Sequence, residues 1–98
     1  MKLTSKQRKF LKSKAHHLKP VVIIGKIQLN QSIIKVIDLS LTSHELIKIK
    51  FNHHKELKRE LIEQINKETS SQSIGFIGNI AIIFRQNLEE DKRIYILD

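Results

Sequence analysis

The sequence contains no cysteine and no tryptophan, and it has only one proline and three glycines in 98 residues. The lack of cysteine excludes disulfides, thiolate catalysis and cysteine-ligated zinc. No apolar run approaches the roughly 20 residues that a membrane-spanning helix needs, and we expect no secretion signal at the N-terminus. No repeat, low-complexity tract or internal linker interrupts the chain. We therefore expect a single globular domain over residues 1–98, located in the cytoplasm.

Acidic residues are missing from the first third of the chain. Residues 1–37 hold nine lysines and arginines and no carboxylate, whereas the remainder sums to −1, so the formal charge of +8 comes from the first third. Such asymmetry is typical of a protein that binds a polyanion. It also fits a basic module that docks on an acidic protein partner, or a merely solvated basic surface.

Hydrophobic periodicity predicts three helices and four strands in the order αβαβαββ. The first helix opens at Thr4, which forms a capping-box pattern with Gln7, and it stops at Pro20. Its apolar stripe includes Phe10, and lysines occupy the opposite side. A second helix follows the N-cap Asn30, and a third runs over about 55–69. Strands are expected over residues 21–24, 46–51, 73–77 and 80–85.

This order predicts an α/β (α+β) fold with a four-stranded mixed sheet and all three helices on one face. The alternation over residues 46–51 would then place Lys48 and Lys50 on the other, solvent-facing side. The core should span about residues 3–86. Residues 87–98 form a polar tail that could hold a short strand over 94–97.

The turn Gly25-Lys26-Ile27-Gln28, between a strand and a helix N-terminus, could hold a phosphate. The first N–H groups of a helix are unpaired, its dipole favours an anion, and the Lys26 ammonium could reach the same group. A turn is also needed simply to connect the two elements, so the pattern alone leaves both interpretations open.

Other patterns give no site. Gly75-Phe76-Ile77-Gly78 has GxxG form, but a strand follows it, so we assign its glycines to a bulge and a hairpin turn. The adjacent histidines at 16–17 and 53–54 have no carboxylate at ligand spacing, which argues against a metal. No nucleophile elbow or phosphate loop is present, so we expect no enzyme, no cofactor and no small-molecule substrate. Aromatic residues are scarce, so an aromatic stacking platform for RNA bases is not expected.

Several blocks of the sequence resemble the CRM domain, and stand-alone YhbY-like proteins in particular. They are Leu3-Thr4-Ser5-Lys6-Gln7-Arg8, Ala15-His16-His17-Leu18-Lys19-Pro20, His44-Glu45-Leu46-Ile47-Lys48-Ile49-Lys50, Ile77-Gly78-Asn79 and Phe84-Arg85. The resemblance covers roughly residues 3–86. It implies a fold similar to the C-terminal domain of translation initiation factor three, RNA binding, association with precursors of the large ribosomal subunit, and no catalysis.

The resemblance also implies an RNA-binding loop of GxxG form, which maps onto residues 25–28, where Gln28 stands in place of the second glycine. We therefore expect a monomer that binds ribosomal RNA, with an acidic protein partner or duplex DNA as the rival interpretations. The expected RNA-binding residues are Lys6, Arg8, Lys9, Lys12, His16, Lys19, Gly25, Lys26, Gln28 and Arg85.

Overall fold

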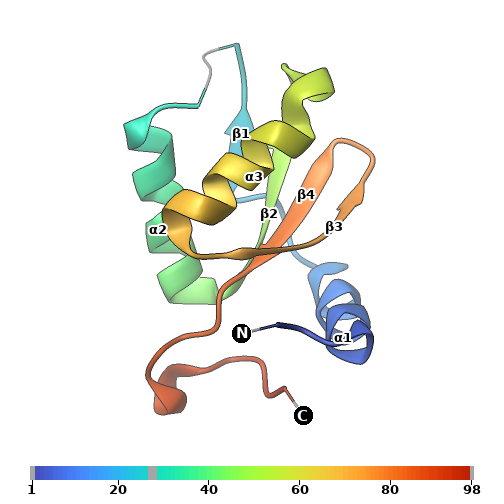
Figure 1. Cartoon of the computed structure of the whole chain (residues 1–98), viewed down its shortest axis with the longest axis vertical. Coiled ribbons are helices and arrows are strands. Elements are labelled where there is room, and N and C mark those ends of the chain that lie inside the picture. The colour runs from blue at the N-terminus through green and yellow to red at the C-terminus, as the bar shows by residue number, and fades with distance from the viewer. Residues whose placement is uncertain (1, 27–28, 98) are drawn as a thin grey trace.

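A computed structural model describes residues 2–26 and 29–97 of the chain. Its helices and strands follow the expected order (Figure 1). They are α1 (Ser5–Ala15), β1 (Val22–Ile24), α2 (Gln31–His44), β2 (Leu46–Phe51), α3 (Lys58–Thr69), β3 (Gln72–Ile77) and β4 (Ile80–Phe84), with 3₁₀ turns at η1 (Lys55–Leu57) and η2 (Glu90–Lys92). No helix formed by the described residues is long and apolar enough to cross a membrane.

The four strands form one mixed sheet in the order β1-β2-β4-β3. β1 and β2 are parallel, while β4 is antiparallel to both of its neighbours, β2 and β3. The register shifts between Ser73 and Gly75, and Gly78 has a φ of 58° in the β3–β4 turn. The α+β fold class, the mixed sheet, and the bulge and turn roles of these glycines are therefore confirmed.

The expected placement of all three helices on one face is wrong. α2 and α3 cover one face, where they pack on alternate residues of β2 and β4 such as Ile49 and Ile83. α1 covers the other face, where Leu11 and Ala15 pack on Ile82. The physical reason is that β4 is apolar on both sides, so both of its faces must be covered.

Lys48 also departs from the expectation of a solvent-facing side chain. It is only 8% exposed, because α1 lies over its face of the sheet, whereas Lys50 is exposed as expected. The Lys48 ammonium donates to the carbonyl oxygen of Leu18 at 3.0 Å and lies 3.5 Å from that of His16. These carbonyls follow the end of α1, where a cation compensates both the unpaired acceptors and the helix dipole.

Local sequence patterns account for the starts of α1 and α2. Thr4 Oγ1 accepts from the Gln7 N–H at 3.1 Å and Gln7 Oε1 accepts from the Thr4 N–H at 2.9 Å, which confirms the capping box. Asn30 Oδ1 accepts from the Ile33 N–H at 2.9 Å and so caps α2 as expected. Phe10, in contrast, is 37% exposed instead of buried. It lies about 100° around the helix from Leu11, whose side faces the sheet.

The tail folds back onto the domain without the strand considered for residues 94–97. The buried Glu45 carboxylate accepts from the backbone N–H groups of Asn87 at 2.6 Å, Ile94 at 2.7 Å and Tyr95 at 3.2 Å. The Tyr95 ring packs edge-on to Phe84 with centroids 6.4 Å apart. Burial, together with the Glu45 charge, raises the pKa of Tyr95 above its ordinary value. In a strand, the N–H groups of Ile94 and Tyr95 would bind a neighbouring strand. Here both donate to the Glu45 carboxylate instead.

Candidate nucleic-acid interface

The outer side of α1 and the β3–β4 hairpin together form a shallow groove, named here the basic groove. The helix contributes residues at positions i, i+3, i+4 and i+7, which lie on one side of an α-helix. The hairpin contributes an isoleucine near its turn. The lining residues are Lys9, Lys12, Ser13, His16, His17 and Ile77. Three of the expected RNA-binding residues, Lys9, Lys12 and His16, are thus brought together.

The positive charge of the basic groove is uncompensated. None of its lining residues is acidic. In the described part of the chain, neither Lys9 nor Lys12 takes part in an ion pair. The end of the Lys12 side chain lies over the bulge, since a Cβ at Gly75 would stand 3.9 Å from both Cε and Nζ of Lys12. Two exposed ammonium groups one turn apart on a helix can contact successive phosphates of a backbone.

The Gly25–Lys26 turn lies at the end of the sheet that also carries the β3–β4 turn. The Ile24 carbonyl accepts from the N–H groups of Asn52 and His53 at 3.0 and 3.2 Å, and the Phe51 N–H donates to the Asn79 carbonyl at 2.8 Å. His54 Nε2 donates to the Lys26 carbonyl at 2.9 Å, which anchors the backbone while the Lys26 side chain stays exposed. Gly25 is not in the left-handed region, and a Cβ built there meets no atom within 4 Å.

The remaining residues of the expected set are dispersed. Lys6 is exposed on the first turn of α1, and Lys19 is exposed in the link between α1 and β1. Arg8 is half-buried and donates to the Ser73 carbonyl, so it joins the start of α1 to β3. Gln28 lies outside the described residues.

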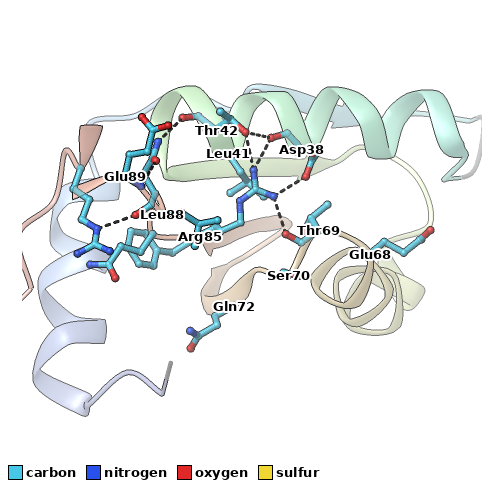
Figure 2. A pocket seen from close by; sticks show the side chains of 14 residues that line it. Asp38, Leu41, Thr42, Glu68, Thr69, Ser70, Gln72, Arg85, Leu88 and Glu89 are labelled. Carbon is cyan, nitrogen blue, oxygen red and sulfur yellow. Dashed lines mark hydrogen bonds and ion pairs between the residues drawn. The ribbon is translucent and has the colours of Figure 1, made fainter. Parts of the chain in front are cut away.

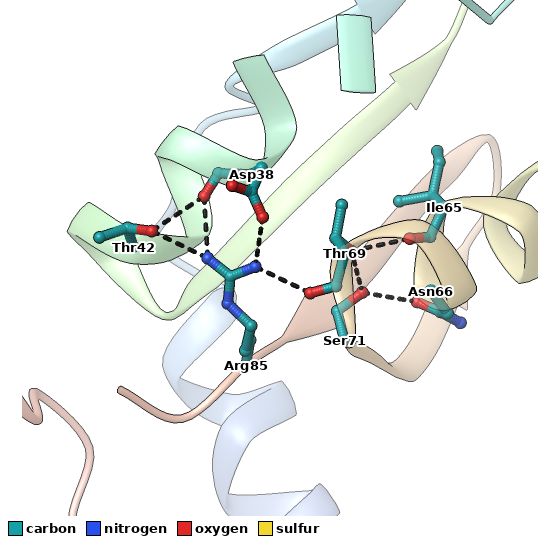
Figure 3. A network of polar contacts seen from close by, with 7 residues as sticks. All are labelled: Asp38, Thr42, Ile65, Asn66, Thr69, Ser71 and Arg85. Carbon is teal, nitrogen blue, oxygen red and sulfur yellow. Dashed lines mark hydrogen bonds and ion pairs between the residues drawn. The ribbon is translucent and has the colours of Figure 1, made fainter. Parts of the chain in front are cut away.

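Arg85 lies on the opposite side of the sheet from α1, between α2 and the end of α3. Its Nη1 donates to Asp38 Oδ1 at 2.6 Å and to the Thr69 carbonyl at 2.8 Å (Figure 3). Its Nη2 donates to the Asp38 carbonyl and to Thr42 Oγ1, both at 2.9 Å. We name this arrangement the Arg85 clasp. The guanidinium therefore connects α2 to the end of α3 through its hydrogen bonds.

The hollow beside the Arg85 clasp is lined by more carboxylates than guanidinium groups, the latter being those of Arg85 and Arg93. Its wall includes the carboxylates of Asp38, Glu68 and Glu89, and the Arg85 guanidinium points toward Asp38 and Thr69 (Figure 2). An entering phosphate would meet these carboxylates and would have to compete for a guanidinium that already has four acceptors. The observed geometry therefore favours a structural role for Arg85.

Sequence reasoning missed several contacts around the hairpin. Lys58 donates to the Gly78 carbonyl at 2.8 Å, and the charges of Lys58 and Arg59 lie 5.9 and 4.8 Å from the Phe76 ring centroid. Ile77 is 47% exposed in the basic groove. No local pattern signals these contacts, because α3 and the hairpin meet only through the tertiary fold. Among the described residues, no three metal-ligating side chains gather into a site.

Comparisons with known proteins place the chain beside RNA-binding proteins. The family model described as the CRS1 / YhbY (CRM) domain matches residues 3–85. An RNA-binding protein of Haemophilus influenzae is 39% identical over 88 residues, or 89% of each chain. The probable RNA-binding protein YqeI of Bacillus subtilis is 39% identical over 93 residues, which cover 94% of this chain and 96% of the relative. The solution structure of the Staphylococcus aureus protein SAV1595 superposes with a TM-score of 0.77 at 35% identity, covering 94% of this chain and 97% of that one.

Proposed function

Because the chain belongs to the CRS1/YhbY (CRM) domain family, we propose that it binds RNA and that the basic groove is the main contact surface. The observation that carries the proposal is the cluster of Lys9, Lys12 and His16 on one side of a helix without a compensating acid. A polyanion is the ligand that such a surface attracts, and the counterions it releases make binding depend steeply on salt. The relatives named as RNA-binding proteins support RNA over other polyanions.

We propose further that the Gly25–Lys26 turn supplies a second phosphate contact. Its backbone is anchored by the His54 ring, and it precedes the N-terminus of α2, where the dipole is positive. The open space around Gly25 lets a phosphate approach the backbone closely. Lys6 and Lys19 extend the positive field, while Arg8 and Arg85 support the fold.

The proposed target is ribosomal RNA in precursors of the large ribosomal subunit, bound in the cytoplasm during ribosome assembly. This part of the proposal rests on the resemblance to YhbY-like proteins. A monomer suffices for it, because the basic groove and the Gly25–Lys26 turn come from one chain. No cofactor or catalytic step is involved.

A competition experiment at one fixed salt concentration tests the proposal. The wild-type protein is bound to a labelled fragment of large-subunit ribosomal RNA, and unlabelled RNA, duplex DNA and polyglutamate are added in turn. RNA should displace the label at the lowest concentration. Equal displacement by duplex DNA would contradict a preference for RNA, and stronger displacement by polyglutamate would favour the acidic protein partner.

A further inference from the structure

One row of side chains crosses all four strands on the α1 face of the sheet. Ile77 pairs with Ile80, Ile80 pairs with Lys50, and Lys50 pairs with Ile23. Residues in register across a sheet point to the same face, and side chains alternate along each strand. Ile80 and Lys50 therefore share the face of Ile82 and Leu46, which pack against α1. We name Ile23, Lys50, Ile80 and Ile77 the uncovered row.

α1 does not cover this row. The helix lies beside the hairpin, away from the end of the sheet that carries the β3–β4 turn (Figure 1). Ile23 is 56% exposed and Ile77 is 47% exposed, while Ile80 is half-buried and Lys50 is exposed. Ile77 is also part of the basic groove. The exposed apolar row thus begins where the lysines and histidines of α1 end.

The charges around the row indicate the kind of ligand. Every ionisable side chain of the uncovered row and of the basic groove is a lysine or a histidine. A fully paired duplex presents mainly sugars and phosphates to a protein, and these gain nothing from isoleucine side chains. An unpaired strand, in contrast, offers apolar base faces beside its phosphates. The isoleucines of the uncovered row and the neighbouring lysines together complement such an unpaired strand.

We propose that the uncovered row receives unpaired nucleobases of an RNA strand whose phosphates lie against Lys9, Lys12 and Lys50. The inference rests on the proposed RNA binding and adds a preference for RNA with unpaired nucleotides beside a helix. Ile77 and Ile80 contact the bases nearest α1, and Ile23 contacts a base further along the strand. Aliphatic side chains replace the aromatic platform that the sequence lacks.

The test compares two RNA hairpins with the same stem, one fully paired and one with a short unpaired segment carrying 2-aminopurine. The double variant Ile23→Thr/Ile77→Thr removes apolar surface but keeps β-branched residues in the strands. Val36→Thr is the matched control, because Val36 is 50% exposed on α2, over the other face of the sheet. Circular dichroism and urea unfolding establish that both variants fold.

The wild-type protein should raise the 2-aminopurine fluorescence, because a base placed on isoleucine side chains leaves the stacked neighbouring bases that quench it. It should also bind the RNA with the unpaired segment more tightly. The double variant should lose about fivefold in affinity for that RNA and distinctly less for the paired hairpin, and both salt slopes should stay unchanged because no charge is removed. The Val36 variant should match the wild type.

Equal losses for the two hairpins, or no loss for either, would overturn the proposal. Polyglutamate has charge but no bases. If the double variant loses as much affinity for polyglutamate as for the RNA with the unpaired segment, the proposal is also overturned. A wild-type protein that binds neither hairpin would instead contradict the proposed function itself. RNA binding without a preference for unpaired nucleotides would contradict only the role of the row.

Discussion

At the scale of single residues, Arg85 and Glu45 bind partners that lie far away in the sequence. Arg85 follows an apolar strand and looks like part of a basic surface, but its acceptors on Asp38, Thr42 and Thr69 lie 16 to 47 residues away in the sequence. Glu45 similarly binds N–H groups of a tail that begins 42 residues later. Local patterns contain no information on such partners, whereas the caps formed by Thr4 and Asn30 need only neighbours three residues away and were predicted.

Replacing Arg85 by lysine should lower the free energy of unfolding. The ammonium keeps the charge but cannot form the forked contacts with Asp38, Thr42 and Thr69, so we expect a loss of about 1–3 kcal/mol by urea unfolding. The folded variant should bind RNA as the wild type does. A normally stable Arg85→Lys protein with weakened RNA binding would show that Arg85 contacts RNA.

Gly25→Ala separates folding from binding at the Gly25–Lys26 turn. A Cβ there meets no atom within 4 Å and the φ is not left-handed, so stability should change by less than about 0.5 kcal/mol. RNA affinity, measured by fluorescence anisotropy, should fall several-fold because the methyl group blocks close approach of a phosphate. Undiminished binding would remove this turn from the interface and leave the basic groove alone.

Tyr95 gives a pH dependence that can be assigned, because it is the only tyrosine in the sequence. Its pKa is raised from 10.0 by burial and by Glu45, so the folded state holds the phenol proton more tightly than the unfolded state. Stability from this group is therefore complete below pH 10 and is lost as pH rises through the folded pKa. Absorbance at 295 nm should show the raised pKa, and Tyr95→Phe should flatten the stability loss above pH 10.

At the scale of elements, helix and strand positions follow from periodicity, but the face that α1 covers does not. The stripe of α1 and the strand over residues 80–84 are both apolar, and such a strand can be covered from either side. The burial of Lys48 follows from the same choice, because its ammonium binds carbonyls that follow α1. Lysines at alternate positions of a strand are therefore exposed only where no helix packs on their face of the sheet.

The outer side of α1 can be tested as a unit with Lys9→Glu/Lys12→Glu. Both side chains are exposed and without ion pairs in the described part of the chain, so each change should alter stability by about 0.5 kcal/mol or less. RNA affinity should fall several-fold or more, and the log–log salt slope should become shallower by roughly two phosphate contacts. The pair Lys55→Glu/Lys67→Glu, on η1 and α3, is a charge-matched control. An unchanged slope in the α1 variant would mean that this helix does not touch RNA.

At the scale of the whole molecule, the net positive charge comes from the first third of the sequence, and the sheet separates the hydrophobic core into two clusters. The acid-free first third contributes α1, β1 and the Gly25–Lys26 turn, while most carboxylates lie beyond α2. Composition alone therefore indicated a polyanion as one class of partner and the first third of the chain as the region proposed to meet it. It could not reveal the contribution of Ile77, because the groove joins α1 to a hairpin that lies 60 or more residues later.

In growing cells the protein should comigrate with precursors of the large ribosomal subunit in sucrose gradients. Raising the salt concentration or treating with nuclease should release it, because the proposed contacts are mainly to phosphates. The Lys9→Glu/Lys12→Glu protein should remain near the top of the gradient. A wild-type protein found only at the top at low salt would contradict the ribosomal target.

The contact between α1 and the β3–β4 hairpin also determines when the basic groove can form during synthesis. Arg8 binds the Ser73 carbonyl 65 residues away, and the apolar stripe of α1 packs on Ile82 and Phe84. A ribosome makes α1 before the hairpin, so the apolar stripe of the helix has no partner while residues 16–71 are synthesised. A chain that stops before β3 carries all of its early lysines but has no groove. Copies terminated before β3 would therefore present the lysines of α1 without the basic groove, which forms only after β3 and β4 have been made.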